Sequence, residues 1–446
     1  MRLLASALAI LLLALSTALH AESRFYDYTL DNGLRVIVLP DHRAPIAVFQ
    51  IWYKVGSSYE YEGITGISHM LEHLMFKGTQ EFPEGEFVKI IAANGGDQNA
   101  FTSLDFTAYY EELEARRLPL AFALEADRMR GLTFDEKELE TEREVVIEER
   151  RLRTEDNPVS RMYERYNTVA QAASPYRYPI IGWMDDLRRY TLQDIENWYN
   201  TWYAPNNAII VVVGDVEPTT VLDLAEHYFG NIPRSKMPAL KTPPEVPPLG
   251  ERRIDFNTVA TTSYVFLGYN VPVINTATEA WEPYALDVLV GVLDGGESAR
   301  LTKDLIKSDV VAAEIGAQYN SFDRLDTLLL IGGIPAPGRT PQELETALGM
   351  QVSRLQNELI DPTELERVKN QVIASDIYAR DSLTLQAVQI GSLASVGLIP
   401  DLMDDYIQNI SAVTAEQVQQ VSKRYLTADR LTVGELIPQS INKETP

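Results

Sequence analysis

The chain has 446 residues, of which 45% are hydrophobic and 23% charged, a balance typical of folded globular domains rather than disordered segments. Its 39 Lys and Arg stand against 64 Asp and Glu, giving a formal net charge of −25, which argues against nucleic-acid binding because such surfaces are basic. The sequence contains no cysteine, so disulfides, zinc–thiolate sites and thiol nucleophiles are excluded, and any metal site must use His, Asp and Glu.

The first residues have the pattern of an export signal. Arg2 supplies a positive start, residues 3–15 form an apolar run, and small residues follow up to Ala21. The apolar run is shorter than the ~20 residues that a membrane span needs, which favours a cleaved signal peptide at 1–21 over a retained anchor. We therefore expect an exported, periplasmic protein with no membrane span in the mature chain.

The chain is expected to fold as two α/β domains joined by a stiff connector. Asp31-Asn32-Gly33 is a hairpin signal between two short strands. Six prolines between Pro233 and Pro248 favour extended backbone. The domains are thus placed at 22–232 and 253–446, with a Pro-rich linker at 233–252. In the first domain the expected elements are strands at 25–30, 34–39 and 46–55, helices at 64–76 and 85–93, a strand over 101–110, helices at 118–130 and 135–153, and a strand at 208–213.

The second half resembles a weak copy of the first. Residues 191–203 precede a strand that is expected to end at Gly214, and residues 414–425 precede one that is expected to end at Gly434. This self-similarity indicates a duplicated α/β domain, although two ordinary helix–strand units could also look alike by chance.

The chemistry is concentrated in His69-Met70-Leu71-Glu72-His73, inside one predicted helix. Because an α-helix has 3.6 residues per turn, His69 and His73 share a face, and both imidazoles can bind one ion. Glu72 projects from nearly the same face, where a carboxylate can reach a water at the metal without being a ligand. Zinc suits these side chains and lowers the pKa of a bound water to ~7. A chance occurrence is improbable in a chain with only 5 histidines.

A catalytic zinc site needs a third protein ligand, and the acidic helix that follows offers candidates. Most of its carboxylates are expected on a solvated face. Glu142 and Glu149 instead lie seven apart on the stripe that carries Val145 and Val146, where a carboxylate needs a partner such as a metal. Spacing alone does not separate Glu149 from its neighbour Glu148.

These features resemble the inverted-zincin peptidases of the pitrilysin/insulinase family. The resemblance covers most of the first half with specific motifs and the second half only in general layout. The matching segments are His69-Met70-Leu71-Glu72-His73, Phe76-Lys77-Gly78-Thr79, Asn94-Gly95-Gly96, Asn99-Ala100-Phe101-Thr102, Tyr109, Glu142-Arg143-Glu144-Val145-Val146, Tyr203-Ala204-Pro205-Asn206-Asn207-Ala208 and Gly214-Asp215-Val216.

The resemblance implies the roles of five side chains. In the family the third ligand lies about 76 residues beyond the second His, so one Zn²⁺ per chain would be held by His69, His73 and Glu149. Glu142 matches the family's supporting carboxylate, and Glu72 would be the general base. The implied activity is zinc-dependent endopeptidase hydrolysis of peptides or unfolded segments, with direct attack by water.

The resemblance also implies an α+β fold of two homologous domains, each an antiparallel-rich sheet with helices packed on one side. Four such domains form a clam-like chamber, of which this chain would supply half. The strand around Asn99, Ala100 and Phe101 would be an open edge that binds the substrate as an added strand.

One departure from the family concerns the second half, where an Arg and a Tyr seven residues apart often contact the substrate. Ile306 and Ala313 occupy those positions here. The simplest solution is a heterodimer with a related exported chain that lacks the zinc motif but keeps the Arg and Tyr; a homodimer stays open. The alternatives to a catalytic subunit are a non-catalytic scaffold of the same fold and a peptide-binding module. The sequence does not indicate the natural substrate.

Overall fold

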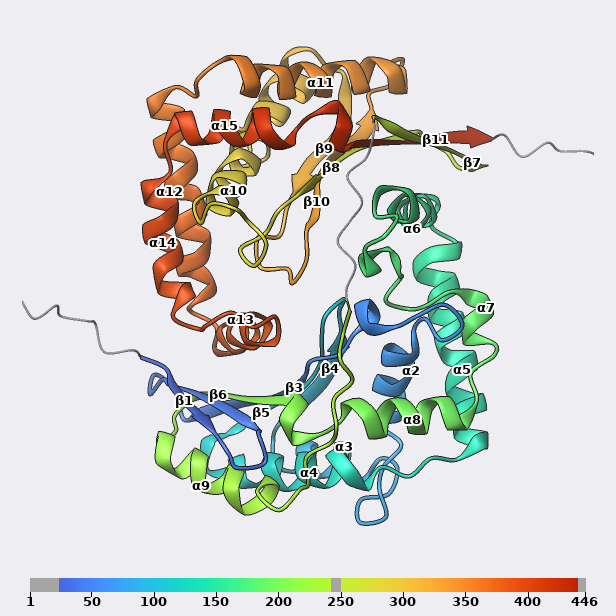
Figure 1. The fold of residues 1–446 in the computed structure, drawn as a ribbon, viewed down its shortest axis with the longest axis vertical. Helices are drawn as coiled ribbons and strands as arrows, with labels where there is room; N and C mark the ends of the chain where they lie inside the picture. The colour runs from blue at the N-terminus through green and yellow to red at the C-terminus, as the bar shows by residue number, and fades with distance from the viewer. Residues whose placement is uncertain (1–23, 242–249, 440–446) are drawn as a thin grey trace, which may run out of the picture.

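The computed structural model describes residues 24–241 and 250–439. The signal peptide predicted at 1–21 lies outside the described residues, as does the stretch 242–249 of the predicted linker. Within the described part, the strands form two separate sheets, each with its own layer of helices (Figure 1). None of the helices in this part is both long enough and apolar enough to cross a membrane.

The first sheet has the strand order β1-β2-β6-β3-β5-β4 within the described residues. Only the β2–β6 pair in it is parallel, and the other neighbours are antiparallel. The segment expected as one strand over 101–110 is instead a hairpin of β4 and β5, because residues 103–106 form a tight turn. The strands are β1 (Tyr26–Thr29), β2 (Arg35–Pro40), β3 (Ile46–Tyr53), β4 (Asp97–Thr102), β5 (Thr107–Glu114) and β6 (Ala208–Gly214).

One face of this sheet is covered by helices of the first half. Val36, Phe49 and Ile51 point from the strands into a core that also contains Met70, and all four side chains are fully buried. The helices that contribute to this core are α2 (Ile67–Leu74), α3 (Glu86–Ala93), α4 (Leu118–Gly131), α5 (Glu136–Arg150), α7 (Met184–Leu187), α8 (Leu192–Trp202) and α9 (Pro218–Phe229).

The second half repeats this plan with the order β7-β11-β8-β10-β9. As β6 lies between parallel β2 and antiparallel β3, so β11 lies between parallel β7 and antiparallel β8. The strands are β7 (Arg252–Val259), β8 (Tyr264–Val271), β9 (Ala312–Gln318), β10 (Thr327–Pro335) and β11 (Leu431–Gln439), and the helices over one face are α10 (Glu282–Leu293), α11 (Pro341–Asn357), α12 (Pro362–Ala379), α14 (Leu402–Ala412) and α15 (Ala415–Tyr425).

The copies also agree locally, since α8 and α15 both begin with a capping box, at Thr191 and at Thr414. The expectation that the last strand ends at Gly434 is wrong, because β11 continues to Gln439. Gly434 lies inside the strand, where its missing side chain leaves room for the ring of Tyr166.

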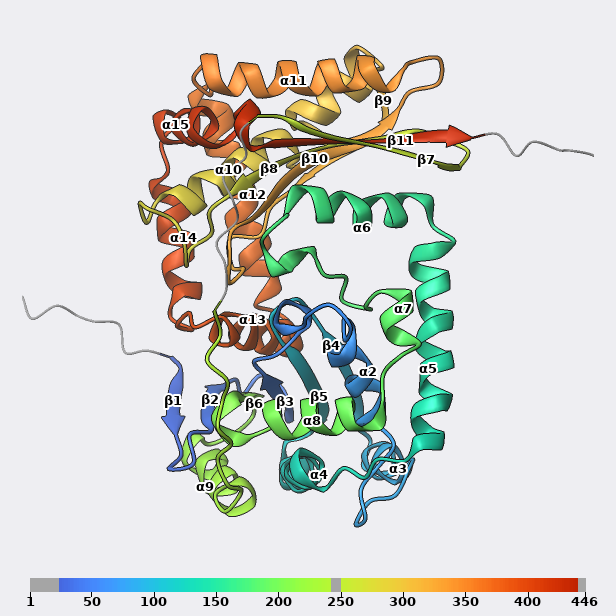
Figure 2. The ribbon, with the colours of Figure 1, turned by 45° about the vertical axis from the view of Figure 1, so that its right-hand side comes forward.

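The face of each sheet that its own helices leave open is covered by one helix from the other half of the chain (Figure 2). From the second half, α13 (Leu383–Ser395) packs on β3 and β6, with Gly391 against the indole of Trp52. From the first half, α6 (Pro158–Ala170) packs on β7 and β11, and the Tyr166 hydroxyl donates to the Thr432 carbonyl at 2.8 Å. The fold class is thus as expected, two homologous α+β domains, and exchanged helices interlock the two domains.

Candidate metal centre

Helix α2 carries His69, Glu72 and His73, and its start is fixed by two features. Gly66 has a positive φ of 83° and packs so closely on the Ile181 carbonyl that a side chain would collide with it. The buried carboxylate of Glu60 accepts hydrogen bonds from the amides of Gly66 at 2.6 Å and Ser68 at 2.9 Å, which satisfies donors at the helix N-terminus. The helix therefore begins at Ile67, three residues after the predicted start.

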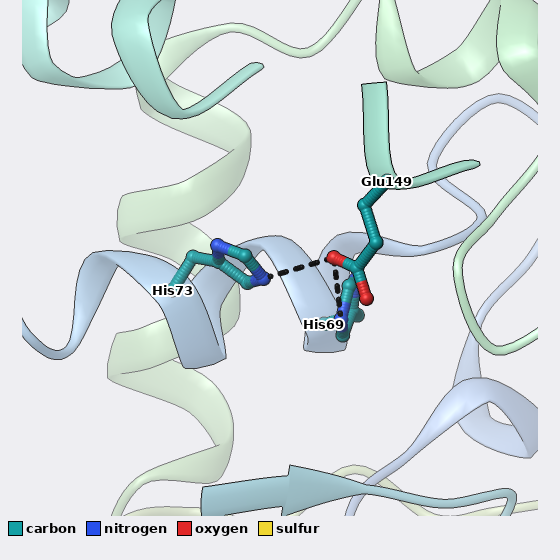
Figure 3. A group of neighbouring side chains, drawn as sticks. All are labelled: His69, His73 and Glu149. Carbon is teal, nitrogen blue, oxygen red and sulfur yellow. Dashed lines mark ion pairs between the residues drawn. The ribbon is translucent and has the colours of Figure 1, made fainter. Parts of the chain in front are cut away.

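Three side chains converge on one point between α2 and the C-terminal end of α5 (Figure 3). The Nε2 atoms of His69 and His73 lie 3.7 Å and 3.4 Å from the same oxygen, Oε2 of Glu149. One ligand atom from each of the three residues lies within 4.8 Å of the other two. Helix geometry supplies the two imidazoles from one element, and α5 adds the carboxylate from a segment 76 residues further along the chain.

The donor set fits a catalytic zinc ion. Zn–N and Zn–O bonds of about 2.0–2.2 Å place the donors of a tetrahedral site roughly 3.3–3.6 Å apart, close to the separations observed here. Two imidazoles and one carboxylate are also the ligand set of one well-known type of catalytic zinc site, which leaves a fourth position for water or substrate. His69, His73 and Glu149 are therefore the candidate zinc ligands.

Glu142 contacts the ring nitrogen of His73 that does not face Glu149. Its Oε2 lies 3.1 Å from Nδ1 of His73, and its Oε1 lies 2.7 Å from Nζ of Lys77. A carboxylate on the outer ring nitrogen fixes the orientation and tautomer of a ligating imidazole. Glu148 is exposed and pairs instead with Arg151 at 2.9 Å.

The apolar stripe of α5 differs in part from the prediction. Val146 is fully buried, but Val145 is 46% exposed and lies off the stripe. The 100° step per residue rotates Val145 toward solvent and brings Glu142, Val146 and Glu149 to the inner side. After Arg150 the helix widens into a π-helical turn at 151–155, from which Arg153 reaches Oε1 of Glu149 at 3.0 Å.

The electrostatics of the cluster follow from burial and from the shared carboxylates. Burial, with the neighbouring charge of His73, lowers the pKa of His69 to about 4. Burial also opposes the charged form of His73, but hydrogen bonds to Glu142 and Glu149 outweigh it and raise the pKa of His73 to about 9. The hydrogen bond from His73 lowers the pKa of Glu149 and of Glu142. The two carboxylates thus favour the charged form of His73.

Glu72 lies beside the three converging donors but is not one of them. Its Oε2 accepts a hydrogen bond of 2.5 Å from Oγ1 of Thr102, the last residue of β4. Burial raises the pKa of the Glu72 carboxyl above its usual value. Thr102 belongs to the Asn99-Ala100-Phe101-Thr102 segment that resembles the family, but the sequence of this segment does not indicate that the Thr102 hydroxyl contacts Glu72.

The cluster opens into a cavity of about 1240 Å³ that both halves line. The predicted substrate-binding residues Asn99, Ala100 and Phe101 all border it, and they lie on β4, one of the two edge strands of the first sheet among the described residues. Ile306 packs against the core of the second half, and Ala313 is exposed on β9. Neither is among the residues that border this cavity.

The second half contributes other residues to the cavity lining, among them Phe266, Gln318, Tyr319, Asp323 and Leu330.

Comparison with known proteins identifies the family that this chain matches. Residues 35–182 match the family described as Insulinase (Peptidase family M16), and residues 189–372 match the Peptidase M16 inactive domain. The zinc protease PqqE of Helicobacter pylori is 34% identical over 367 residues, which cover 81% of this chain and 82% of that protein.

Solved structures agree. A crystal structure of a protease from Helicobacter pylori matches with a TM-score of 0.88 and 30% identity over 94% of this chain and 100% of that one. The periplasmic protease PqqL from Escherichia coli matches with a TM-score of 0.79 and 20% identity over 95% of this chain but 48% of that one. The relatives that this chain matches are thus named zinc proteases or proteases. The chain belongs to the insulinase family, peptidase family M16.

Proposed function

We propose that this chain is the catalytic subunit of a zinc-dependent endopeptidase that hydrolyses peptides or unfolded segments. The observation that carries the proposal is the convergence of His69, His73 and Glu149 beside a fourth side chain, the half-buried carboxylate of Glu72, at the wall of a large cavity. A scaffold subunit would have no need to keep all four groups together.

When bound, zinc would polarise a peptide carbonyl and lower the pKa of a water molecule. Glu72 would take up the proton of the attacking water at its carboxylate and return it to the leaving amine. Burial favours the protonated state of Glu72, which suits a group that must hold a proton for part of the cycle. Thr102 fixes one carboxylate oxygen, and Glu142 fixes the ring of His73.

The edge strand β4 would hold the substrate. Because β4 pairs only with β5 among the described strands, its other side offers main-chain N–H and C=O groups to an extended peptide. Such binding is largely independent of side chains, which suits a peptidase acting on unfolded segments.

We further propose an exported heterodimer. PqqL, of which this chain matches 48%, supports the idea that a second unit of this fold completes the chamber. A related chain that supplies the Arg and Tyr replaced here by Ile306 and Ala313 would be the partner. The predicted signal peptide and the periplasmic relative favour a periplasmic location.

The experiment that tests the peptidase proposal is zinc removal and return. Purified protein should contain about one zinc per chain by elemental analysis. A chelator should abolish cleavage of a quenched peptide, and added Zn²⁺ should restore it. A chain that binds no zinc and cleaves no peptide would exclude the proposal in favour of a scaffold or peptide-binding role, and a chain that cleaves equally well without zinc would exclude the zinc mechanism.

A further inference from the structure

The turn between β9 and β10 in the second half reaches across to the first half. Nε of Arg324 donates to Oδ1 of Asp105 at 2.8 Å, and Nη2 donates to Oγ of Ser58 at 2.8 Å. The guanidinium also lies 4.7 Å from the ring centre of Tyr59. The side chains of Arg324 and Asp105 are only 17% and 4% exposed, so this is a desolvated ion pair between segments 219 residues apart.

The Asp105 carboxylate accepts hydrogen bonds from side chains of three separate segments. Besides Arg324, Ser58 donates to Oδ1 at 2.6 Å and the Tyr176 hydroxyl donates to Oδ2. The same hydroxyl accepts hydrogen bonds from the backbone amides of Arg324 at 2.9 Å and Leu325 at 3.1 Å. The carboxylate and the phenol therefore act as one junction between the halves.

This junction holds the turn that joins β4 to β5. The amide of Ser103 donates to the carbonyl of Phe106 at 2.8 Å, and the amide of Ser58 donates to the carbonyl of Leu104 at 2.8 Å. Gly56 approaches the Ser103 and Leu104 carbonyls so closely that a side chain there would collide with them. The residue just before the turn is Thr102, which holds Glu72.

We propose that Arg324, from the half that has no candidate metal ligand in its described residues, is a positioning residue for the peptidase site. It fixes the β4–β5 turn and, through that turn, both the Thr102–Glu72 hydrogen bond and the substrate edge of β4. The inference rests on the proposed peptidase function. Docking of the halves does not depend on it, because α13 and α6 already bury Trp52 and Tyr166 between the halves.

Arg324→Gln is the test variant and Arg300→Gln the matched control. Arg300 forms a two-point pair with Glu364, at 2.7 Å and 3.0 Å, but within the second half, and its side chain is 8% exposed against 17% for Arg324. Arg324→Lys serves as the conservative variant, since an ammonium can pair with Asp105 but lacks the fork that also reaches Ser58.

The first readout is hydrogen exchange over residues 102–107 in the zinc-loaded chain, which needs no catalysis. Arg324→Gln should exchange faster there, with unchanged exchange in β3 and β6 and unchanged zinc content. The second is peptide hydrolysis in the most active preparation of the protein, where kcat should fall by ~10–10² with a smaller change in KM, because small misplacements of reacting groups carry costs of that size. Arg324→Lys should recover part of the loss.

Wild-type exchange at the turn and wild-type kcat in Arg324→Gln would overturn the inference. An equal loss in Arg300→Gln would also overturn it, because general destabilisation would then explain both. If Arg324→Gln does not fold, Ser58→Ala, which removes one contact of the guanidinium, must show the same two effects in weaker form. The exchange readout separates this inference from the proposed function, since the latter fails if the wild-type chain binds no zinc or does not hydrolyse peptides together with the proposed partner chain.

Discussion

Glu142 joins the imidazole of His73 to the ammonium of Lys77, with contacts of 3.1 Å and 2.7 Å on its two oxygens. Both partners belong to the segment around α2, whereas Glu142 lies two turns before Glu149 on α5. The side chain thus ties the two elements that must stay aligned if three donors are to meet at one ion. Its contact with Nδ1 leaves Nε2 of His73 directed at Glu149.

Glu142→Gln should therefore weaken zinc binding about 10–100-fold, the usual effect of removing an outer partner of a ligating histidine. A competition titration against a zinc-selective chelator measures this change. Glu144→Gln is the control, because Glu144 is exposed on the same helix. Equal affinity in the two variants would mean that Glu142 does not orient His73.

Glu149→Gln should remove a zinc ligand and lower affinity far more than Glu142→Gln does, because an amide is a poor replacement for a carboxylate on zinc. Glu148→Gln changes the adjacent residue on the exposed side and should leave zinc affinity nearly unchanged. The same titration compares them. The opposite order, or equal losses, would show that the third ligand has been assigned to the wrong residue.

The chain alone is expected to bind zinc but to hydrolyse peptides poorly, and a related exported chain with the Arg and Tyr should restore activity. Loss of one donor to the developing negative charge on a substrate oxygen can reduce the rate by ~10²–10³, and neither Ile306 nor Ala313 can donate from its side chain. Activity of size-fractionated protein with and without the partner checks this. Full activity from the chain alone would contradict the heterodimer.

Folding stability should depend on pH through Glu60, whose pKa burial raises to about 7. An acid with a raised folded-state pKa stabilises the fold below its unfolded pKa, near 4.5, and this contribution is lost as pH rises toward 7. The difference amounts to roughly 3 kcal/mol. Urea unfolding of metal-free wild type and Glu60→Gln between pH 4.5 and 7.5 measures it. Parallel pH profiles of the two proteins would contradict the assignment.

Local pattern was enough to predict the helical pair His69 and His73, because their spacing of four residues by itself puts two imidazoles on one face. The inward-facing carboxylates of the acidic helix were harder to predict. Periodicity placed Glu142 on the inner side, but it also placed Val145 there, which is exposed. Choosing Glu149 over Glu148 needed the resemblance to a family, since adjacent residues differ by only 100° around the helix.

Long-range features left little local signal. The turn at 103–106 contains neither Gly nor Pro, and its turn-favouring residues Ser103 and Asp105 alone do not interrupt a predicted strand. The turn is held by Asp105 through side chains as distant as Arg324. The helices exchanged between the domains were likewise not predictable, because which sheet an amphipathic helix covers depends on the whole fold. Gly391 and Gly434 become meaningful only once Trp52 and Tyr166 are seen against them.

We propose that Glu72 acts as the base at a zinc site to which it contributes no ligand. Glu72→Gln should keep about one zinc per chain, since His69, His73 and Glu149 are untouched, while hydrolysis of a quenched peptide falls by at least ~10²–10⁴. Zinc content and rate are measured on the same preparation. If the variant keeps its zinc and still cleaves at close to the wild-type rate, Glu72 is not the base.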